Sequence, residues 1–347
     1  MIVCPARLEP TFSLRPWGIR SLAPLFPEKI NLAEPIGEAW MTGNESRFVD
    51  GAFAGKTLGE AWPAMPPEWT GASLDRGAAF PLLVKFIFSE DKLSVQVHPD
   101  DAYAAKHENG GRGKTEMWYA MNARPGAEVL AGLRPEVTRE SFEKAIAAGT
   151  AEDCLVHVPV RAGDVVFVPA GTTHTIGAGL VLCEIQQQSD TTYRVYDYNR
   201  RDVKGNTREL HIEKALEVIR FGEQLGGKIT PVLTESDGVA KTYFVACPYF
   251  ATAKWEFAGR AAASTSRERF ELLIFLEGGG NIEWASSHAE YGPAQVWLLP
   301  AELGAFALAA DSRTSVLRTF VPGDSKKVWR GLIEQGVTES DLARILG

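Results

Sequence analysis

The segment at residues 93–101, Leu-Ser-Val-Gln-Val-His-Pro-Asp-Asp, constrains the fold of this chain more than any other. Gln96 and His98 fall on one face of an alternating strand and two valines fall on the other, because side chains two positions apart on a strand point the same way. The proline that follows ends the strand, since it has no N–H to donate. Gln96 and His98 are therefore expected to project into one space, within reach of a single ion.

Two more residues of the metal-ligand type follow along the chain. Glu116 ends a Gly-Lys-Thr-Glu segment, and His174 follows a Pro-Ala-Gly turn at residues 169–171. Two neutral imidazoles, a carboxylate and an amide oxygen suit Zn²⁺, and would also accept Fe²⁺, Co²⁺ or Mn²⁺. Either histidine alone would more often be a core or rim residue, but the two together favour a metal centre with Lewis-acid character. The remaining histidines are interpreted as surface or structural residues: His107, His157, His211 and His288.

Two lysines are expected near this centre. Lys114 shares a strand face with Glu116 by the same period of two, so it is expected to face the same cavity. Lys85 lies inside the almost continuous apolar run at residues 79–88, which predicts a central strand. A lysine in a buried strand is costly unless it is paired. Lys85 is therefore either part of a salt bridge at the rim or a residue of the site.

Arg194 and Asp190 follow the strand that comes after His174, and are expected at the mouth of a barrel. Arginine in such a place suits an anionic, planar or phosphate-bearing ligand. The alternative is a salt bridge between Arg194 and either Asp190 or Asp197, and spacing alone leaves both interpretations open.

Short apolar segments separated by turn residues predict a mainly β chain of two domains. A turn, an apolar strand and a Pro-Ala pair occur in both halves, at residues 163–170 and 292–301, but a histidine follows only in the first. We therefore expect two related β-barrels with a few short helices, of which only one holds metal. The expected domains are 1–225, with the metal, and 226–347, without metal ligands. Helices are expected at 57–62, 100–105, 138–146 and 209–221, and the capping box opened by Thr138 is expected to be incomplete.

Composition narrows the class of protein. The net charge of -8 argues against a nucleic-acid surface, and no apolar run approaches the 18 residues of a membrane span. Four scattered cysteines without CxxC spacing are typical of reduced thiols. We expect a cytoplasmic protein with no membrane or nucleic-acid partner.

Four segments, in this order, resemble the type I mannose-6-phosphate isomerases of the short bacterial form: residues 96–101, 113–116, 169–179 and 184–197. The resemblance implies two cupin-like, jelly-roll barrels and an aldose-ketose isomerase that interconverts mannose 6-phosphate and fructose 6-phosphate through an enediol. It implies one Zn²⁺ per chain, and a monomer or weak homodimer. The implied metal ligands are Gln96, His98, Glu116 and His174. The implied catalytic residues are Arg194, Lys114 and Asp190, and those binding the phosphosugar are Lys114, Arg194 and Lys85.

Two other functions are compatible with parts of this residue set. An Fe²⁺ cupin dioxygenase would use His98, Glu116 and His174 as a two-histidine, one-carboxylate set. Gln96 as a fourth protein ligand leaves fewer open positions for oxygen and substrate, which argues against it. A non-catalytic sugar-binding cupin is the third possibility, and the charged residues Lys114 and Arg194 beside the ligands argue against that one. The sequence does not identify the general base.

Overall fold

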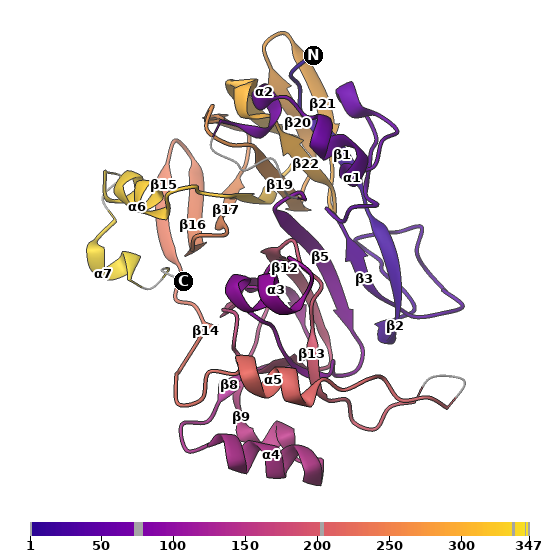
Figure 1. Cartoon of the computed structure of the whole chain (residues 1–347). Coiled ribbons are helices and arrows are strands. Elements are labelled where there is room, and N and C mark those ends of the chain that lie inside the picture. The colour runs from indigo at the N-terminus through magenta and orange to yellow at the C-terminus, as the bar shows by residue number, and fades with distance from the viewer. Residues whose placement is uncertain (1, 73–78, 202–204, 335–336, 344, 346–347) are drawn as a thin grey trace.

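The computed structural model describes residues 2–72, 79–201, 205–334, 337–343 and 345 (Figure 1). Most of its regular structure is strand, arranged in four antiparallel sheets, none of which closes on itself within the described residues. The predicted mainly β architecture with a few short helices is thus confirmed, whereas the description as two closed barrels stays a prediction. No helix in the described ranges is long and apolar enough to cross a bilayer.

The first half of the chain forms most of two sheets that face each other. The seven-stranded sheet, called here the central sheet, has the order β14 (Gly227–Lys228), β10 (Val165–Val168), β7 (Glu116–Ala123), β12 (Leu180–Gln187), β5 (Leu82–Ser89), β3 (Ile36–Trp40) and β2 (Thr11–Ile19). The five-stranded sheet has the order β13 (Tyr193–Tyr196), β6 (Val95–Val97), β11 (His174–Ile176), β8 (Glu128–Leu133) and β9 (Leu155–Pro159). An apolar cluster joins them, with Ile87 and Leu182 on one side and Val129 and Ile176 on the other.

The second half builds an eight-stranded and a four-stranded sheet. The first has the order β15 (Val232–Ser236), β16 (Val239–Ala246), β17 (Ala251–Phe257), β24 (Thr314–Phe320), β19 (Glu271–Glu277), β22 (Val296–Leu299), β1 (Ala6–Glu9) and β4 (Arg47–Phe48). The second has the order β18 (Arg260–Ser264), β23 (Ala305–Ala310), β20 (Gly280–Trp284) and β21 (Ser287–Tyr291). Two N-terminal strands therefore complete a sheet of the other half, with Ala6 opposite Leu298. The division at residues 225 and 226 stays a prediction.

The central sheet is buried on both faces. Phe86 and Ile185 on one face belong to the largest core cluster, together with Leu272 and Leu317 of the eight-stranded sheet. The opposite face packs on the five-stranded sheet, as described above. Every residue of β5 is consequently buried, which is the physical reason for the almost continuous apolar run at residues 79–88.

The described residues form short helices at α1 (Leu58–Ala61), α2 (Pro67–Thr70), α3 (Asp101–His107), α4 (Arg139–Ala148), α5 (Ile212–Val218), α6 (Ser325–Glu334) and α7 (Glu339–Leu342). Short 3₁₀ turns occur at Gly51–Phe53, Trp62–Ala64, Ala151–Cys154 and Ala301–Leu303. In Figure 1, α4 and α5 lie at the end of the molecule farthest from the eight-stranded sheet, and they pack on the five-stranded sheet.

Two predictions about these helices are wrong in detail. The capping box of α4 is complete, because the Ser141 hydroxyl accepts the Thr138 N–H at 2.9 Å in the place that Glu or Gln usually takes. Helix α5 is shorter than the predicted 209–221, since it begins after His211 and the backbone at Ile219 is already extended.

Candidate metal centre and active site

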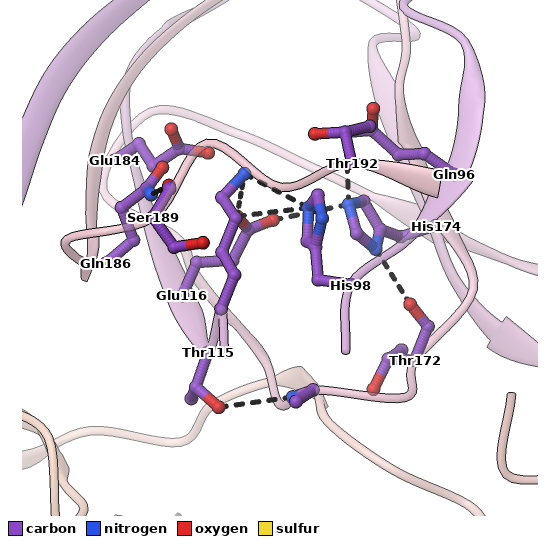
Figure 2. Close-up of polar contacts among 12 residues, drawn as sticks. Gln96, His98, Thr115, Glu116, Thr172, His174, Glu184, Gln186, Ser189 and Thr192 are labelled. Atoms are coloured by element: carbon purple, nitrogen blue, oxygen red, sulfur yellow. Dashed lines mark hydrogen bonds and ion pairs between the residues drawn. The ribbon is translucent and has the colours of Figure 1, made fainter. Parts of the chain in front are cut away.

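The four predicted metal ligands come from the two facing sheets. Gln96 in β6 and His174 in β11 are direct partners in the five-stranded sheet, and His98 follows β6 by one residue. Glu116 is the first residue of β7 in the central sheet. Figure 2 shows the four side chains turned toward one another, and the period-two argument predicts the common face of Gln96 and His98.

The distances between these side chains suit a single small cation. His98 Nε2 lies 3.6 Å from Glu116 Oε2, and His174 Nε2 lies 3.3 Å from Glu116 Oε1. The Gln96 amide lies 3.2 Å from His174 Nε2. A half-turn about the last side-chain bond would exchange the amide oxygen and nitrogen, so Gln96 can present either atom at this point.

Both imidazoles are aimed by main-chain carbonyl groups. His98 Nδ1 donates to the Thr191 carbonyl at 2.9 Å, and His174 Nδ1 donates to the Thr172 carbonyl at 2.8 Å. A carbonyl can only accept, so each ring carries its proton on Nδ1 and turns the lone pair of Nε2 toward Glu116. Burial lowers the pKa of His174 to about 4 and that of His98 well below its usual value. Both rings are therefore neutral, as metal ligands must be.

Glu116 is fully buried, and neither of its carboxylate oxygens accepts a well-aligned hydrogen bond from a described residue. Lys114 Nζ lies 2.8 Å from Glu116 Oε2 and 3.0 Å from His98 Nε2. A buried carboxylate is costly unless cations balance its charge. The donor atoms and this carboxylate therefore fit a divalent metal ion held by His98, Glu116 and His174, with Gln96 beside them.

A cavity of about 440 Å³ adjoins the metal ligands. Every catalytic or substrate-binding residue expected from the sequence lines it: Lys85, Lys114, Asp190 and Arg194. The lining also includes polar side chains that the sequence did not single out: Arg15, Glu38, Ser94, Glu184, Arg208 and His211. The proposed metal site thus lies beside a cavity whose wall contains several arginine and lysine side chains.

Comparison with known proteins decides the family. A family model for the catalytic domain of type I phosphomannose isomerases matches residues 6–131. The chain is 38% identical over 308 residues to a Bacillus subtilis protein named probable mannose-6-phosphate isomerase GmuF, a match that covers 88% of this chain and 96% of that protein. It belongs to the type I mannose-6-phosphate isomerase family.

Two further matches agree. A mannose-6-phosphate isomerase of Streptococcus mutans is 38% identical over 282 residues, which cover 80% of this chain and 86% of the relative. The crystal structure of the mannose 6-phosphate isomerase from Bacillus subtilis superposes with a TM-score of 0.83 at 31% identity, over 91% of this chain and 99% of that one. The likeness to this isomerase family therefore extends over both halves of the chain.

For Lys85 of this isomerase, the sequence left two alternatives, a salt bridge or a place in the site, and the structure has features of both. Its Cα lies opposite that of Glu184 across the β5–β12 ladder. Its Nζ lies 3.5 Å from Glu184 and 3.4 Å from Asp190, over the ring of Trp40. Burial lowers the pKa of Lys85, but the Glu184 carboxylate and the other nearby acidic side chains outweigh burial and raise the pKa above its usual value. Lys85 is thus ion-paired, protonated and part of the cavity wall.

Arg194 has neutral partners. Its Nε donates to Ser94 Oγ at 3.2 Å and its Nη1 donates to the Glu209 carbonyl at 3.0 Å. Asp190 instead approaches Lys85, and Asp197 pairs with two other arginines. Among the described residues, the alternative of a salt bridge from Arg194 to Asp190 or Asp197 is therefore not found.

Glu184 and His211 are two of the cavity-wall residues that sequence reasoning missed. Glu184 is buried and accepts the Trp118 indole N–H at 3.0 Å. The sequence signal for Glu184 is a charged residue within an apolar strand, which is the same signal that marks Lys85. His211, interpreted from the sequence as surface or structural, lines the cavity and lies 3.4 Å from the Arg194 main-chain nitrogen. No local pattern marks His211, because it is brought in from a loop.

Proposed function

We propose that this chain interconverts mannose 6-phosphate and fructose 6-phosphate, using one Zn²⁺ held by Gln96, His98, Glu116 and His174. The observation that carries the proposal is the convergence of these four side chains beside a cationic cavity, in a chain of this family. The reaction moves a proton between C1 and C2, so it needs a base, stabilisation of charge on the sugar oxygens and an anchor for the phosphate. A bound zinc ion supplies charge stabilisation.

Arg194 is proposed to anchor the anionic substrate or to stabilise the enediolate. Arg15 and Arg208 line the same cavity but are each paired with a carboxylate, Glu38 and Asp197 respectively. Arg194 makes its contacts with neutral oxygens, so its positive charge remains available to an anion. The cavity volume falls within the usual range for small-molecule sites, about 300–1,000 Å³.

Lys114 is proposed to exchange protons with the substrate or to bind its oxygens. Its Nζ lies within 3.0 Å of a proposed metal ligand, so a sugar oxygen held at the metal would be within its reach. The cavity wall holds the carboxylates of Glu38, Glu184 and Asp190, and Lys85 contacts the last two. We propose that Asp190 acts with Lys114 on the substrate, and that Lys85 binds substrate beside Asp190.

A coupled assay that follows conversion of mannose 6-phosphate tests the activity directly. Metal analysis of the purified protein is expected to find one zinc per chain, and an oxygen electrode is expected to record no uptake. Oxygen consumption without isomerisation would favour the dioxygenase, and binding of mannose 6-phosphate without turnover would favour the non-catalytic cupin.

His98→Ala is expected to lose bound metal and isomerase activity together, because it removes one of the imidazole donors. The matched control is His157→Ala, since His157 is exposed and contacts Glu128 instead. Metal content and activity of the control are expected to equal those of the wild type. Full activity in metal-free His98→Ala would exclude the assignment.

The remaining expectations are also proposals. We propose a cytoplasmic enzyme, which the four free cysteines support, and a monomer or weak homodimer. We propose residues 1–225 as the metal-binding domain and 226–347 as a second β domain without metal ligands. Size-exclusion chromatography with light scattering measures the oligomeric state.

A further inference from the structure

The short segment that carries Lys114 is held by two side chains outside the cavity. Asp101 Oδ1 accepts the Gly113 N–H at 2.8 Å and the Gln187 amide N–H at 2.9 Å. Gln187 Oε1 in turn accepts the Thr115 N–H at 2.9 Å. The main-chain groups immediately before and after Lys114 are therefore bound by one connected pair of side chains, Asp101 and Gln187.

The backbone around Lys114 has little freedom left. Lys114 N–H donates to the Pro99 carbonyl at 3.0 Å, and the Thr115 carbonyl accepts the Gln187 main-chain N–H at 3.1 Å. A Cβ at Gly113 would lie 2.5 Å from the main chain at the start of α3, so only glycine permits this approach. The position of the Lys114 Cα is consequently fixed by the start of α3 and by the end of β12.

Asp101 and Gln187 do not line the cavity beside the metal ligands. They line a separate hollow of about 330 Å³ behind it, which Tyr249 from the second half of the chain also lines. Burial and the neighbouring Asp101 carboxylate raise the pKa of Tyr249 to about 12, so its hydroxyl remains a donor to Asp101. Neither Asp101 nor Gln187 can touch a substrate in the cavity, and any influence on the reaction must pass through the segment that they hold.

We propose that Asp101 and Gln187 are positioning residues for Lys114. They set the place from which its ammonium group reaches the metal ligands and the sugar. This inference rests on the proposed function, in which Lys114 contacts the substrate. It also connects the second half of the chain to the segment that carries Lys114, through Tyr249 and Asp101.

Replacing Gln187 tests the proposal. Gln187→Leu keeps the approximate side-chain volume but removes both hydrogen bonds. It is expected to lower kcat/KM about 10- to 100-fold, the usual cost of a misplaced reacting group. Zinc content should change little, because Gln187 touches no proposed metal ligand. The matched control is Gln188→Leu, since Gln188 follows β12 and bonds Asn44 instead, so its loss should leave activity unchanged.

A double variant separates positioning from a general structural effect. If Gln187 acts only through Lys114, then Lys114→Ala/Gln187→Leu has the same kcat/KM as Lys114→Ala. Independent losses that multiply in the double variant would overturn the proposal.

Asp101 gives a second test that does not need residual activity in Lys114→Ala. Asp101→Asn keeps an oxygen that can accept from Gly113 and Gln187, whereas Asp101→Ala keeps none. Asp101→Asn is expected to retain most of the wild-type kcat. Asp101→Ala is expected to lose as much activity as Gln187→Leu loses. Equal activities in the two Asp101 variants would overturn the proposal. A wild-type enzyme without isomerase activity would instead refute the proposed function.

Discussion

Lys85 is a buried cation whose charge is balanced inside the protein. Its side chain is 3% exposed, and Glu184, which faces it, is 4% exposed. Removing one partner of such a pair leaves an uncompensated buried charge, whereas removing both does not. The Lys85–Glu184 pair therefore affects both the stability of the fold and the active-site cavity, because both side chains also line the cavity.

Lys85→Met is expected to destabilise the protein by about 3–5 kcal/mol, because Glu184 loses its closest cation. Lys85→Met/Glu184→Gln is expected to recover part of this stability without recovering activity. Urea unfolding measures the first effect and the coupled assay measures the second. Identical unfolding midpoints for the single and double variants would show that the two charges are not coupled.

At the residue scale, much of the site could be predicted because its signals are local. The spacing of Gln96 and His98 fixes a common strand face, and Lys114 and Glu116 repeat that spacing. The Pro-Ala-Gly turn before His174 and the family resemblance predict that His174 belongs to the same site. His211 and Ser94 could not be found in this way, since only the packing of the loops brings them to the cavity.

At the scale of single elements, Asp197 ties the segment after β13 to the cavity wall. Its buried carboxylate accepts hydrogen bonds from Arg200 and from Arg208, a residue of the wall. Burial alone would raise the pKa of Asp197, but these two guanidinium groups outweigh burial and hold it below its usual value of 3.8. Asp197 therefore stabilises the fold when it is ionised.

The sign of this shift gives a pH dependence. A carboxyl group with a lowered pKa contributes stability above pH 3.8 and loses the contribution as the pH falls through its folded-state pKa. The difference in unfolding free energy between wild type and Asp197→Asn is thus expected to be constant near neutral pH and to shrink below pH 3.8. Denaturant unfolding over this pH range measures it, and a difference independent of pH would contradict the assignment.

Strands and helices were predicted best where their own sequence carries the pattern. Short apolar segments between turn residues predict strands at residues 251–257 and 280–284, and these are the spans of β17 and β20. β15 was missed, although Asp237 and Gly238 form a two-residue turn with positive φ at both positions, the usual signature of a hairpin. The strand was overlooked because its own residues, Val232–Ser236, are mostly polar and only its pairing with β16 makes it a strand.

At the scale of the whole molecule, the central sheet depends on both halves of the chain. One of its faces packs against the eight-stranded sheet, and that sheet in turn includes β1 and β4 from the N-terminus. No local pattern reports such an exchange of strands, and the division of the chain into two domains at residues 225 and 226 stays a prediction.

A fragment of residues 1–225 is accordingly expected not to fold independently, even though it contains all four proposed metal ligands. It would expose the apolar face that includes Phe86 and Ile185, and β1 would lose its partner β22. The fragment should show no cooperative unfolding transition and no stoichiometric zinc binding. A cooperatively folded fragment that binds zinc would show that the halves are independent.

The carbonyl groups that aim the two imidazoles belong to Thr172 and Thr191, but the side chains of these threonines play no part in the contact. Thr172 Oγ1 is buried without a hydrogen-bond partner among the described residues. Replacing either threonine side chain therefore leaves the carbonyl group that aims the ring, provided that the loops keep their course. The orientation of the two proposed imidazole ligands is carried by the path of the chain, where a comparison of residue identities would not detect it.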